Sequence, residues 1–349
     1  MFYHFPWLLG NGMPEEHDQS TSKTDLGDDA ETARAGMGAP ALRAEHSSAH
    51  EPLRGIFIGA SGPLPGWRIF LYLGMGVILF FLLSPLEQLI PLRDAGRLWR
   101  DLYIQSVLVI ASLVPAALMA AIEKRSFSAY GLTARSAFGK QFWMGLLWGL
   151  VSLSALMLLM HLVGAFSTEG LALHGSRIAK FAVYWGLYFL LVGFFEEFTF
   201  RGYTLFTLAS GVGFWPSAVV LSLIFGGLHL FNAGEAWMGA LAAACLGLFF
   251  CFTVRRTGML WFAVGMHASW DWGESFVYSV PDSGSMVPGH LLNPSFHGSP
   301  WLTGGSVGPE GSVLLFVVLA ILWVLFDRLY PTAIDKGRAS SPNTEENPR

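Results

Sequence analysis

The stretch from Gly193 to Arg201 reads GFFEEFTFR and lies inside an apolar run from Phe181 to Leu208. It places two adjacent carboxylates and a guanidinium where a bilayer-spanning helix is expected. A charged side chain at the centre of a bilayer costs roughly 3 kcal/mol or more. The three ionisable residues of this stretch, Glu196, Glu197 and Arg201, therefore need a functional or a strong structural reason.

The spacing of these three residues separates their roles. Glu197 and Arg201 are four positions apart, so they lie on one helix face and can form an ion pair. Glu196 is rotated from Glu197 by about 100° around the helix axis. It therefore faces a different neighbour and is the candidate reactive group.

The composition around this stretch is that of an integral membrane protein. Of the 349 residues, 53% are hydrophobic and 13% are charged, against roughly 25% charged residues in soluble domains. The mean hydropathy is +0.48. The formal net charge of −4 is spread over tails and loops, so it indicates neither nucleic acid nor another strongly charged partner. We expect the lipid bilayer as the environment.

Apolar runs long enough to cross a bilayer, which takes about 20 helical residues, recur along the chain. They predict an all-α protein, a polytopic transmembrane helix bundle of about eight spans, at residues 67–83, 102–122, 142–166, 181–208, 215–231, 237–254, 259–277 and 313–329. The bundle thus occupies residues 67–330. Residues 1–66 and 331–349 are polar tails, the first of them predicted to be largely disordered.

The distribution of Lys and Arg predicts the orientation. Basic residues are more frequent after the second, fourth and sixth spans and in the C-terminal tail than on the opposite side, and such an excess marks the cytoplasmic side. We therefore expect a multi-pass protein of the bacterial inner (plasma) membrane with both termini in the cytoplasm. The Gly-, Ser- and Pro-rich loop at 278–311 is expected outside the cytoplasm, as a turn-rich cap over the bundle.

Three further ionisable residues lie well inside predicted spans: His229 in the fifth, and His267 and Asp271 in the seventh. Counted from the cytoplasmic ends at 1.5 Å per residue, they and Glu196 are all roughly 13 to 21 Å deep. A layer shared by three helices is expected of a functional site. A carboxylate there can act as a general base towards water, and histidines can stabilise an oxyanion or bind a metal. A buried ion pair with two structural histidines is the alternative.

The motifs Glu196-Glu197-x-x-x-Arg201, Phe225-x-x-x-His229 and His267-x-x-x-Asp271 occur in this order, each in its own apolar run. This pattern resembles the CPBP family of intramembrane proteases, which includes the CAAX prenyl endopeptidases and many bacterial Abi-type proteins. The resemblance covers about residues 180–275. It implies an intramembrane endopeptidase.

The resemblance also implies residue roles. Glu196 would activate the attacking water with His229 beside it, Glu197 and Arg201 would complete the first motif, and His267 with residue 271 would stabilise the oxyanion. Members are often labelled metalloproteases, so a divalent metal such as zinc, with His229, His267, Glu196 and Asp271 as candidate ligands, stands beside a metal-free glutamate route. The sequence has no His-Glu-x-x-His motif that would require zinc.

Position 271 departs from the family pattern, because it is often Asn in the prenyl endopeptidases and is Asp271 here. An ionised carboxylate cannot donate a hydrogen bond to an oxyanion, whereas an amide can. Three alternatives follow: Asp271 is protonated, it orients His267, or it binds a cation.

The predicted function is cleavage of a peptide bond in a membrane-embedded or lipidated, CAAX-type substrate. Since bacteria generally lack protein prenylation, another membrane protein or peptide is the expected substrate. Two other classes remain alternatives. A non-catalytic membrane scaffold or bacteriocin-immunity protein would tolerate Glu196→Ala. A transporter with an intramembrane ion site would show inverted repeats, and none is evident in the sequence. The sequence defines no oligomeric state.

Overall fold

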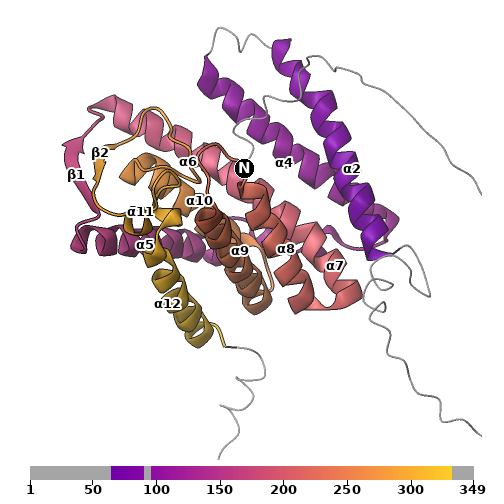
Figure 1. Ribbon diagram of the computed structural model, residues 1–349. Helices are drawn as coiled ribbons and strands as arrows, with labels where there is room; N and C mark the ends of the chain where they lie inside the picture. The colour runs from indigo at the N-terminus through magenta and orange to yellow at the C-terminus, as the bar shows by residue number, and fades with distance from the viewer. Residues whose placement is uncertain (1–63, 90–95, 332–349) are drawn as a thin grey trace, which may run out of the picture.

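The computed structural model describes residues 64–89 and 96–331 (Figure 1). The predicted tails therefore lie almost entirely outside the described residues. The described part is built of helices, which confirms the all-α prediction: α2 (Pro65–Leu83), α4 (Arg97–Ile122), α5 (Lys140–Leu162), α6 (Ser176–Glu197), α7 (Leu205–Val212), α8 (Phe214–His229), α9 (Trp237–Thr257), α10 (Trp261–Trp272), the short α11 (Pro300–Thr303) and α12 (Val313–Leu329).

Five helical segments are long and apolar enough to cross a membrane. They are Pro65–Gln88, Arg97–Ile122, Lys140–Leu162, Ser176–Val212 and Trp237–Thr257. Helix α8 is apolar but shorter. Each of the eight predicted spans contains a helix, but a count of eight crossings is not confirmed.

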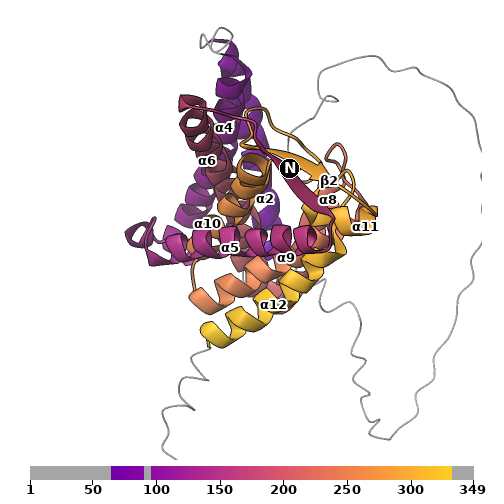
Figure 2. The same cartoon turned by 90° about the vertical axis from the view of Figure 1, so that its left-hand side faces the viewer.

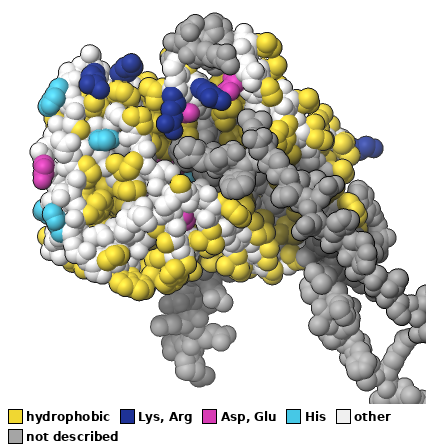
Figure 3. All heavy atoms as spheres, turned by 45° about the horizontal axis from the view of Figure 1, so that its top comes forward, with side chains coloured by type: hydrophobic (Ala, Val, Ile, Leu, Met, Phe, Trp, Pro, Cys, Tyr) yellow, Lys and Arg dark blue, Asp and Glu magenta, His cyan; other side chains and the backbone are white. Residues whose placement is uncertain are grey.

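Large apolar side chains are exposed on the outer faces of these helices, as expected for a surface that meets lipid. Ile78, Leu158, Val183 and Leu223 are each more than half exposed, although they come from four different helices. Hydrophobic side chains are widely spread over the face drawn in Figure 3. Apolar patches of this extent are unusual on a soluble monomer, and the chain is a multi-pass membrane protein.

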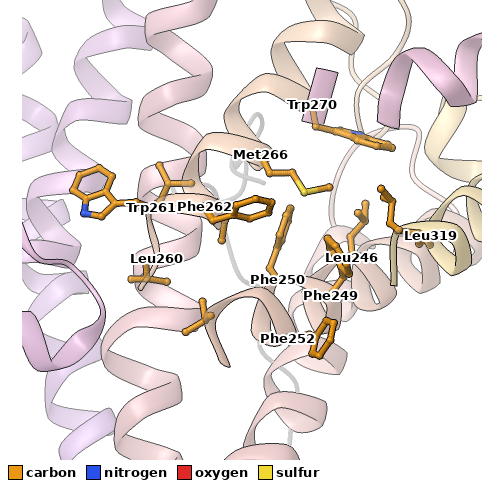
Figure 4. Packing of buried hydrophobic residues seen from close by; sticks show 14 of the residues in the cluster. Leu246, Phe249, Phe250, Phe252, Leu260, Trp261, Phe262, Met266, Trp270 and Leu319 are labelled. Carbon is orange, nitrogen blue, oxygen red and sulfur yellow. The ribbon is translucent and has the colours of Figure 1, made fainter. Parts of the chain in front are cut away.

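Helix α10 lies at the centre of the bundle. Helices α2 and α4 lie side by side at one edge of the bundle. Helix α5 lies on the side of α10 away from α2 and α4 and runs across the direction of those two helices (Figures 1 and 2). Helix α6 packs on α10 from the side opposite α5, while α8 and α9 form a closely packed pair. Figure 4 shows Phe262 and Met266 of α10 beside Phe249 and Phe250 of α9 in the buried core.

Small residues allow α5 and α10 to approach at backbone distance. A Cβ atom at Gly145 would overlap the carbonyl of Phe262, and one at Gly149 would overlap the carbonyl of Met266. Small residues four positions apart are a common way for membrane helices to cross closely. This crossing fixes the position of α10 and of the side chains that it carries.

Gly149→Ala is therefore expected to destabilise the protein by about 1–3 kcal/mol, the usual cost of overpacking a filled core. Thermal unfolding in detergent measures this change. Gly74→Ala in α2 is the control, because a Cβ atom there meets nothing within 4 Å. Equal unfolding temperatures for the two variants would contradict the close crossing.

A two-stranded antiparallel sheet departs from the purely helical prediction. Strand β1 (Phe166–Leu171) pairs with β2 (Leu292–Phe296), with Phe166 opposite Phe296. The predicted third span, 142–166, therefore ends early, because α5 stops at Leu162 and Phe166 begins the strand. The sheet fastens the 278–311 loop to the connection that follows α5.

Candidate functional site

The two glutamates of the opening stretch are the last two residues of α6. The chain continues as a π-helical segment, η5 (Phe198–Thr204), before α7 begins. The backbone of Gly202 leaves helical geometry there, with φ −84° and ψ −114°. The predicted span 181–208 lies within the helical segment Ser176–Val212, and this π-helical segment is a local irregularity inside it. Single π-turns of this kind are frequent at functional sites.

Glu197 links two helices through one carboxylate. Its Oε1 atom accepts hydrogen bonds from Arg201 Nη1 at 3.2 Å and from His267 Nδ1 at 2.8 Å. The Glu197 and Arg201 side chains are 0% and 1% exposed. The sequence spacing predicts the contact with Arg201. The contact with His267 depends on how α6 packs against α10.

The guanidinium of Arg201 is enclosed by aromatic rings and by a glycine. It lies over the Phe225 ring, 4.1 Å from the ring centroid, with Phe200 and Phe250 within 6 Å. A Cβ atom at Gly247 of α9 would overlap Arg201 Nη2. We predict close helix packing for the small-residue stripe Gly239-x-x-x-Ala243-x-x-x-Gly247, and its Gly247 makes room for this side chain.

Gly247→Ala is expected to displace Arg201 and, through Glu197, His267. Misplacement of a catalytic constellation by about 1 Å can lower a rate by roughly 100-fold, so we expect cleavage to fall by about 10- to 100-fold. Gly186→Ala in α6 is the control, since its nearest neighbour would be 3.7 Å away. Initial cleavage rates at matched protein concentration test the difference, and equal rates would exclude this role of Gly247.

His267 stands between three carboxylates. Besides the bond from Nδ1 to Glu197, its Nε2 atom lies 3.4 Å from Asp271 Oδ2 and 3.7 Å from Glu196 Oε2. Its ring stacks on Phe250 with a centroid distance of 5.5 Å and an interplanar angle of 10°. These contacts hold the ring in one orientation. The structure thus brings together both members of each predicted i,i+4 pair.

His229 is the last residue of α8 and comes to the site from a third helix. Its Nδ1 atom lies 2.8 Å from the carbonyl oxygen of Phe225 and donates to it, and its ring lies 4.6 Å from the Phe225 ring. A histidine that donates from Nδ1 in its neutral form has a lone pair on Nε2. That atom can accept a proton or bind a metal.

A small cavity of about 40 Å³ joins these elements. Since a site needs roughly 10–15 Å³ to hold one water, it has room for a reacting water. Of the predicted residues, Glu196, His229, His267 and Asp271 line it, while Glu197 and Arg201 are buried beside it. The remaining lining residues are Val192, Phe225, Ala243, Leu246, Phe250, Trp270, Asp282, Ser283 and Glu310.

The 278–311 loop contributes lining residues that the sequence patterns do not identify. Asp282, Ser283 and Glu310 line the cavity, although Glu310 and Asp282 are distant in sequence from the motifs of α6 and α8. Burial raises the pKa of Asp282 well above its ordinary value, and the carboxylates of Asp271 and Glu310 raise it further. Burial likewise raises the pKa of Glu310, against a lowering by the Ser283 hydroxyl. The composition of the loop predicts a cap over the bundle, but no local sequence signal identifies Asp282, Ser283 and Glu310 as the residues that reach the cavity.

Glu274 is a further buried carboxylate near the site, and its side chain is fully buried. It lies in the π-helical segment η6 (Gly273–Tyr278) that follows α10. Its position near the end of a predicted span makes it resemble a residue at the membrane edge. Its spacing of three from Asp271, on the same helical face, is the signal that could identify it.

Comparison with known proteins identifies the segment that contains these motifs. Residues 178–273 match the family model described as Type II CAAX prenyl endopeptidase Rce1-like. This match confirms the resemblance to the CPBP and CAAX protease family, and it supports a peptidase in general. No curated protein and no solved structure matches the chain.

Proposed function

We propose that this protein is an intramembrane endopeptidase in which Glu196 activates a water molecule for attack on a peptide bond. The observation that carries the proposal is the cavity itself. Glu196, His229, His267 and Asp271 come from three separate helices and line one buried space of about 40 Å³. A carboxylate removed from bulk solvent beside a bound water is suited to general-base catalysis.

His229 and His267 act on opposite sides of the reacting carbonyl in this proposal. His229 has its Nδ1 bonded to a backbone carbonyl, so its Nε2 can hold the attacking water. His267 stands among Glu196, Glu197 and Asp271, and both of its ring nitrogens can carry a proton. As an imidazolium, it can donate from Nε2 to the oxyanion that forms when water attacks.

Asp271 orients His267 in this mechanism. Its Oδ2 atom, 3.4 Å from His267 Nε2, favours that role over direct donation to the oxyanion, since a carboxylate only accepts hydrogen bonds. Glu197 orients the same ring by accepting a hydrogen bond from its other nitrogen, Nδ1. Together the two carboxylates fix the orientation of the ring.

The residue types suit a zinc ion, but among the described residues no three of Glu196, His229, His267 and Asp271 bring their ligand atoms within 4.8 Å of one another. In metal sites the second nitrogen of a ligating histidine almost always donates to a carboxylate or a backbone carbonyl. His267 and His229 make one bond of each kind. His229, His267 and Glu196 would hold the ion, with Asp271 as a further candidate, and zinc would supply electrophilic polarisation of the carbonyl. Glu197 and the carbonyl of Phe225 would still orient the two histidines.

We further propose that the substrate is a membrane protein or peptide, lipidated or membrane-embedded, and that cleavage takes place in the bacterial inner membrane. The apolar exteriors of the helices favour a substrate that arrives through the bilayer. The proposed orientation keeps both termini in the cytoplasm, as the distribution of basic residues favours.

The decisive experiment incubates full-length protein in liposomes with three substrate pools: transmembrane peptides, prenylated CAAX peptides and unmodified soluble peptides. Mass spectrometry then identifies new chain ends. Cleavage of a membrane-associated pool by wild-type protein, and its loss in Glu196→Ala, is the expected result. Equal cleavage by both proteins would overturn the proposal. No cleavage of any pool would favour the scaffold alternative.

A further inference from the structure

A second group of acidic side chains lies beside the candidate active site. Glu274 of η6 and Asp282 and Glu310 of the 278–311 loop each offer a carboxylate oxygen, and these oxygens all lie within 4.8 Å of one another. The three residues are 0%, 9% and 8% exposed. Three carboxylates gathered away from solvent repel one another unless something neutralises them.

Of the three carboxylates, that of Glu274 has the fewest hydrogen bonds. Both of its carboxylate oxygens are buried and accept no hydrogen bond of normal geometry among the described residues; the Trp270 indole N–H lies nearby but also makes no bond of normal geometry. A buried acceptor without a partner costs about 1–3 kcal/mol, and more if it is charged. Two oxygens of one side chain in this condition, beside two other carboxylates, point to a site that suits a positive ligand.

The other two carboxylates are held in place by hydroxyl groups. Glu310 Oε2 accepts from the Ser283 hydroxyl at 2.8 Å and from the Ser283 backbone N–H at 3.2 Å. Asp282 Oδ2 accepts from the Ser275 hydroxyl at 3.3 Å. These bonds leave the second oxygen of each carboxylate available. Within residues 64–89 and 96–331, neither Lys nor Arg forms an ion pair with any of the three.

We propose that Glu274, Asp282 and Glu310 bind a divalent cation of the size of Ca²⁺. The donor set consists entirely of oxygen atoms, which hard cations prefer, and it contains neither His nor Cys. Ca²⁺ binds oxygen at 2.3–2.6 Å, so two ligands on opposite sides of the ion are roughly 4.6–5.2 Å apart. This is the largest separation that two ligands of one ion can have, and the three oxygens, all within 4.8 Å of one another, are close enough to share one ion.

The cation would fasten the loop to the helix that carries His267 and Asp271. Glu274 belongs to the continuation of α10, whereas Asp282 and Glu310 stand at two separated places in the loop. Asp282 and Glu310 also line the candidate active-site cavity. An ion that bridges all three therefore holds the cap closed over that cavity. This consequence for activity depends on the proposed function, but binding of the ion does not.

The test uses full-length protein in detergent after removal of metals with EGTA. Equilibrium dialysis against Ca²⁺ gives stoichiometry and affinity, and thermal unfolding with and without Ca²⁺ gives the linked stabilisation. We expect one Ca²⁺ per wild-type chain and a higher unfolding temperature. In Glu274→Gln/Asp282→Asn, we expect affinity at least about tenfold weaker, the lower range for loss of a supporting group. Absence of Ca²⁺ binding by the wild type would overturn the proposal.

Two matched variants locate the ion. Glu169→Gln removes an exposed carboxylate of β1 and should bind Ca²⁺ as the wild type does. Glu196→Gln alters the candidate catalytic cavity and should also retain the ion, even where cleavage is lost. Unchanged binding in the double variant, or loss of binding in Glu196→Gln, would overturn the assignment to Glu274, Asp282 and Glu310.

The double variant could lose Ca²⁺ because it misfolds, so a milder variant and a second measurement are included. Ser275→Ala removes one hydrogen bond to Asp282 and should weaken Ca²⁺ binding by a smaller factor than the double variant. In limited proteolysis of the wild type, an added protease should cleave the 278–311 loop more slowly with Ca²⁺ than with EGTA. The double variant should be cleaved at the same rate under both conditions. A calcium-independent rate in the wild type would contradict the bridging role.

Discussion

Glu196→Gln is expected to lower the rate of peptide cleavage by at least about 100-fold, within the range that general-base catalysis contributes. Glutamine has nearly the same volume as glutamate, but it cannot take a proton from water. The measurement is the initial rate of cleavage of the substrate identified in liposomes.

The folded state should tolerate this substitution well. Glu196 is 3% exposed, and removing a buried negative charge removes a desolvation cost. The unfolding temperature should therefore remain close to that of the wild type, so that a loss of activity is not a loss of folding. Glu169→Gln supplies the activity control. If Glu196→Gln retained wild-type activity, Glu196 would not be the base.

Arg201→Ala is expected to have the largest effect on stability, a loss of about 3–5 kcal/mol. This is the usual cost of removing one partner of a buried ion pair, because the other charge is left without compensation. Glu197 and Arg201 are both essentially inaccessible to solvent. Thermal or denaturant-induced unfolding in detergent measures the change.

A double substitution separates the structural role of the pair from its role in catalysis. Replacing a buried ion pair by apolar residues of similar volume is often neutral or stabilising, so Glu197→Leu/Arg201→Met should regain much of the stability lost in Arg201→Ala. Cleavage should remain low, because His267 Nδ1 then loses its acceptor, now at 2.8 Å. If the double variant recovered activity together with stability, Glu197 would be a structural residue only.

The helices and the layer of polar residues could be predicted because each follows from residues close together in the sequence. Apolar runs predict helices without reference to neighbours, and the spacing of four between Glu197 and Arg201 predicts their contact on any helix. Depth along separate spans also predicts that Glu196, His229, His267 and Asp271 lie close together. The resemblance of the three motifs to a protease family, which the match over residues 178–273 confirms, rests on the same local patterns.

Other features depend on contacts that no local pattern encodes. A π-helical segment follows Glu197, at the point where the chain passes from the neighbours of α6 to those of α7. The strands β1 and β2 pair across a long sequence separation. The number of membrane crossings also depends on tertiary packing, since α8 and α12 are short and partly enclosed by other helices.

The sequence by itself determined a helical membrane protein with a layer of ionisable residues inside it. A bilayer requires long apolar helices and makes ionisable residues within them costly, so both features can be recognised in the sequence. Only the tertiary structure decided that Glu197 holds His267 as well as Arg201. It alone brought Asp282 and Glu310 over the cavity, beside the buried carboxylate of Glu274. The physical reason is that a helix fixes contacts three or four residues apart, whereas contacts between helices and loops follow from how the whole bundle packs.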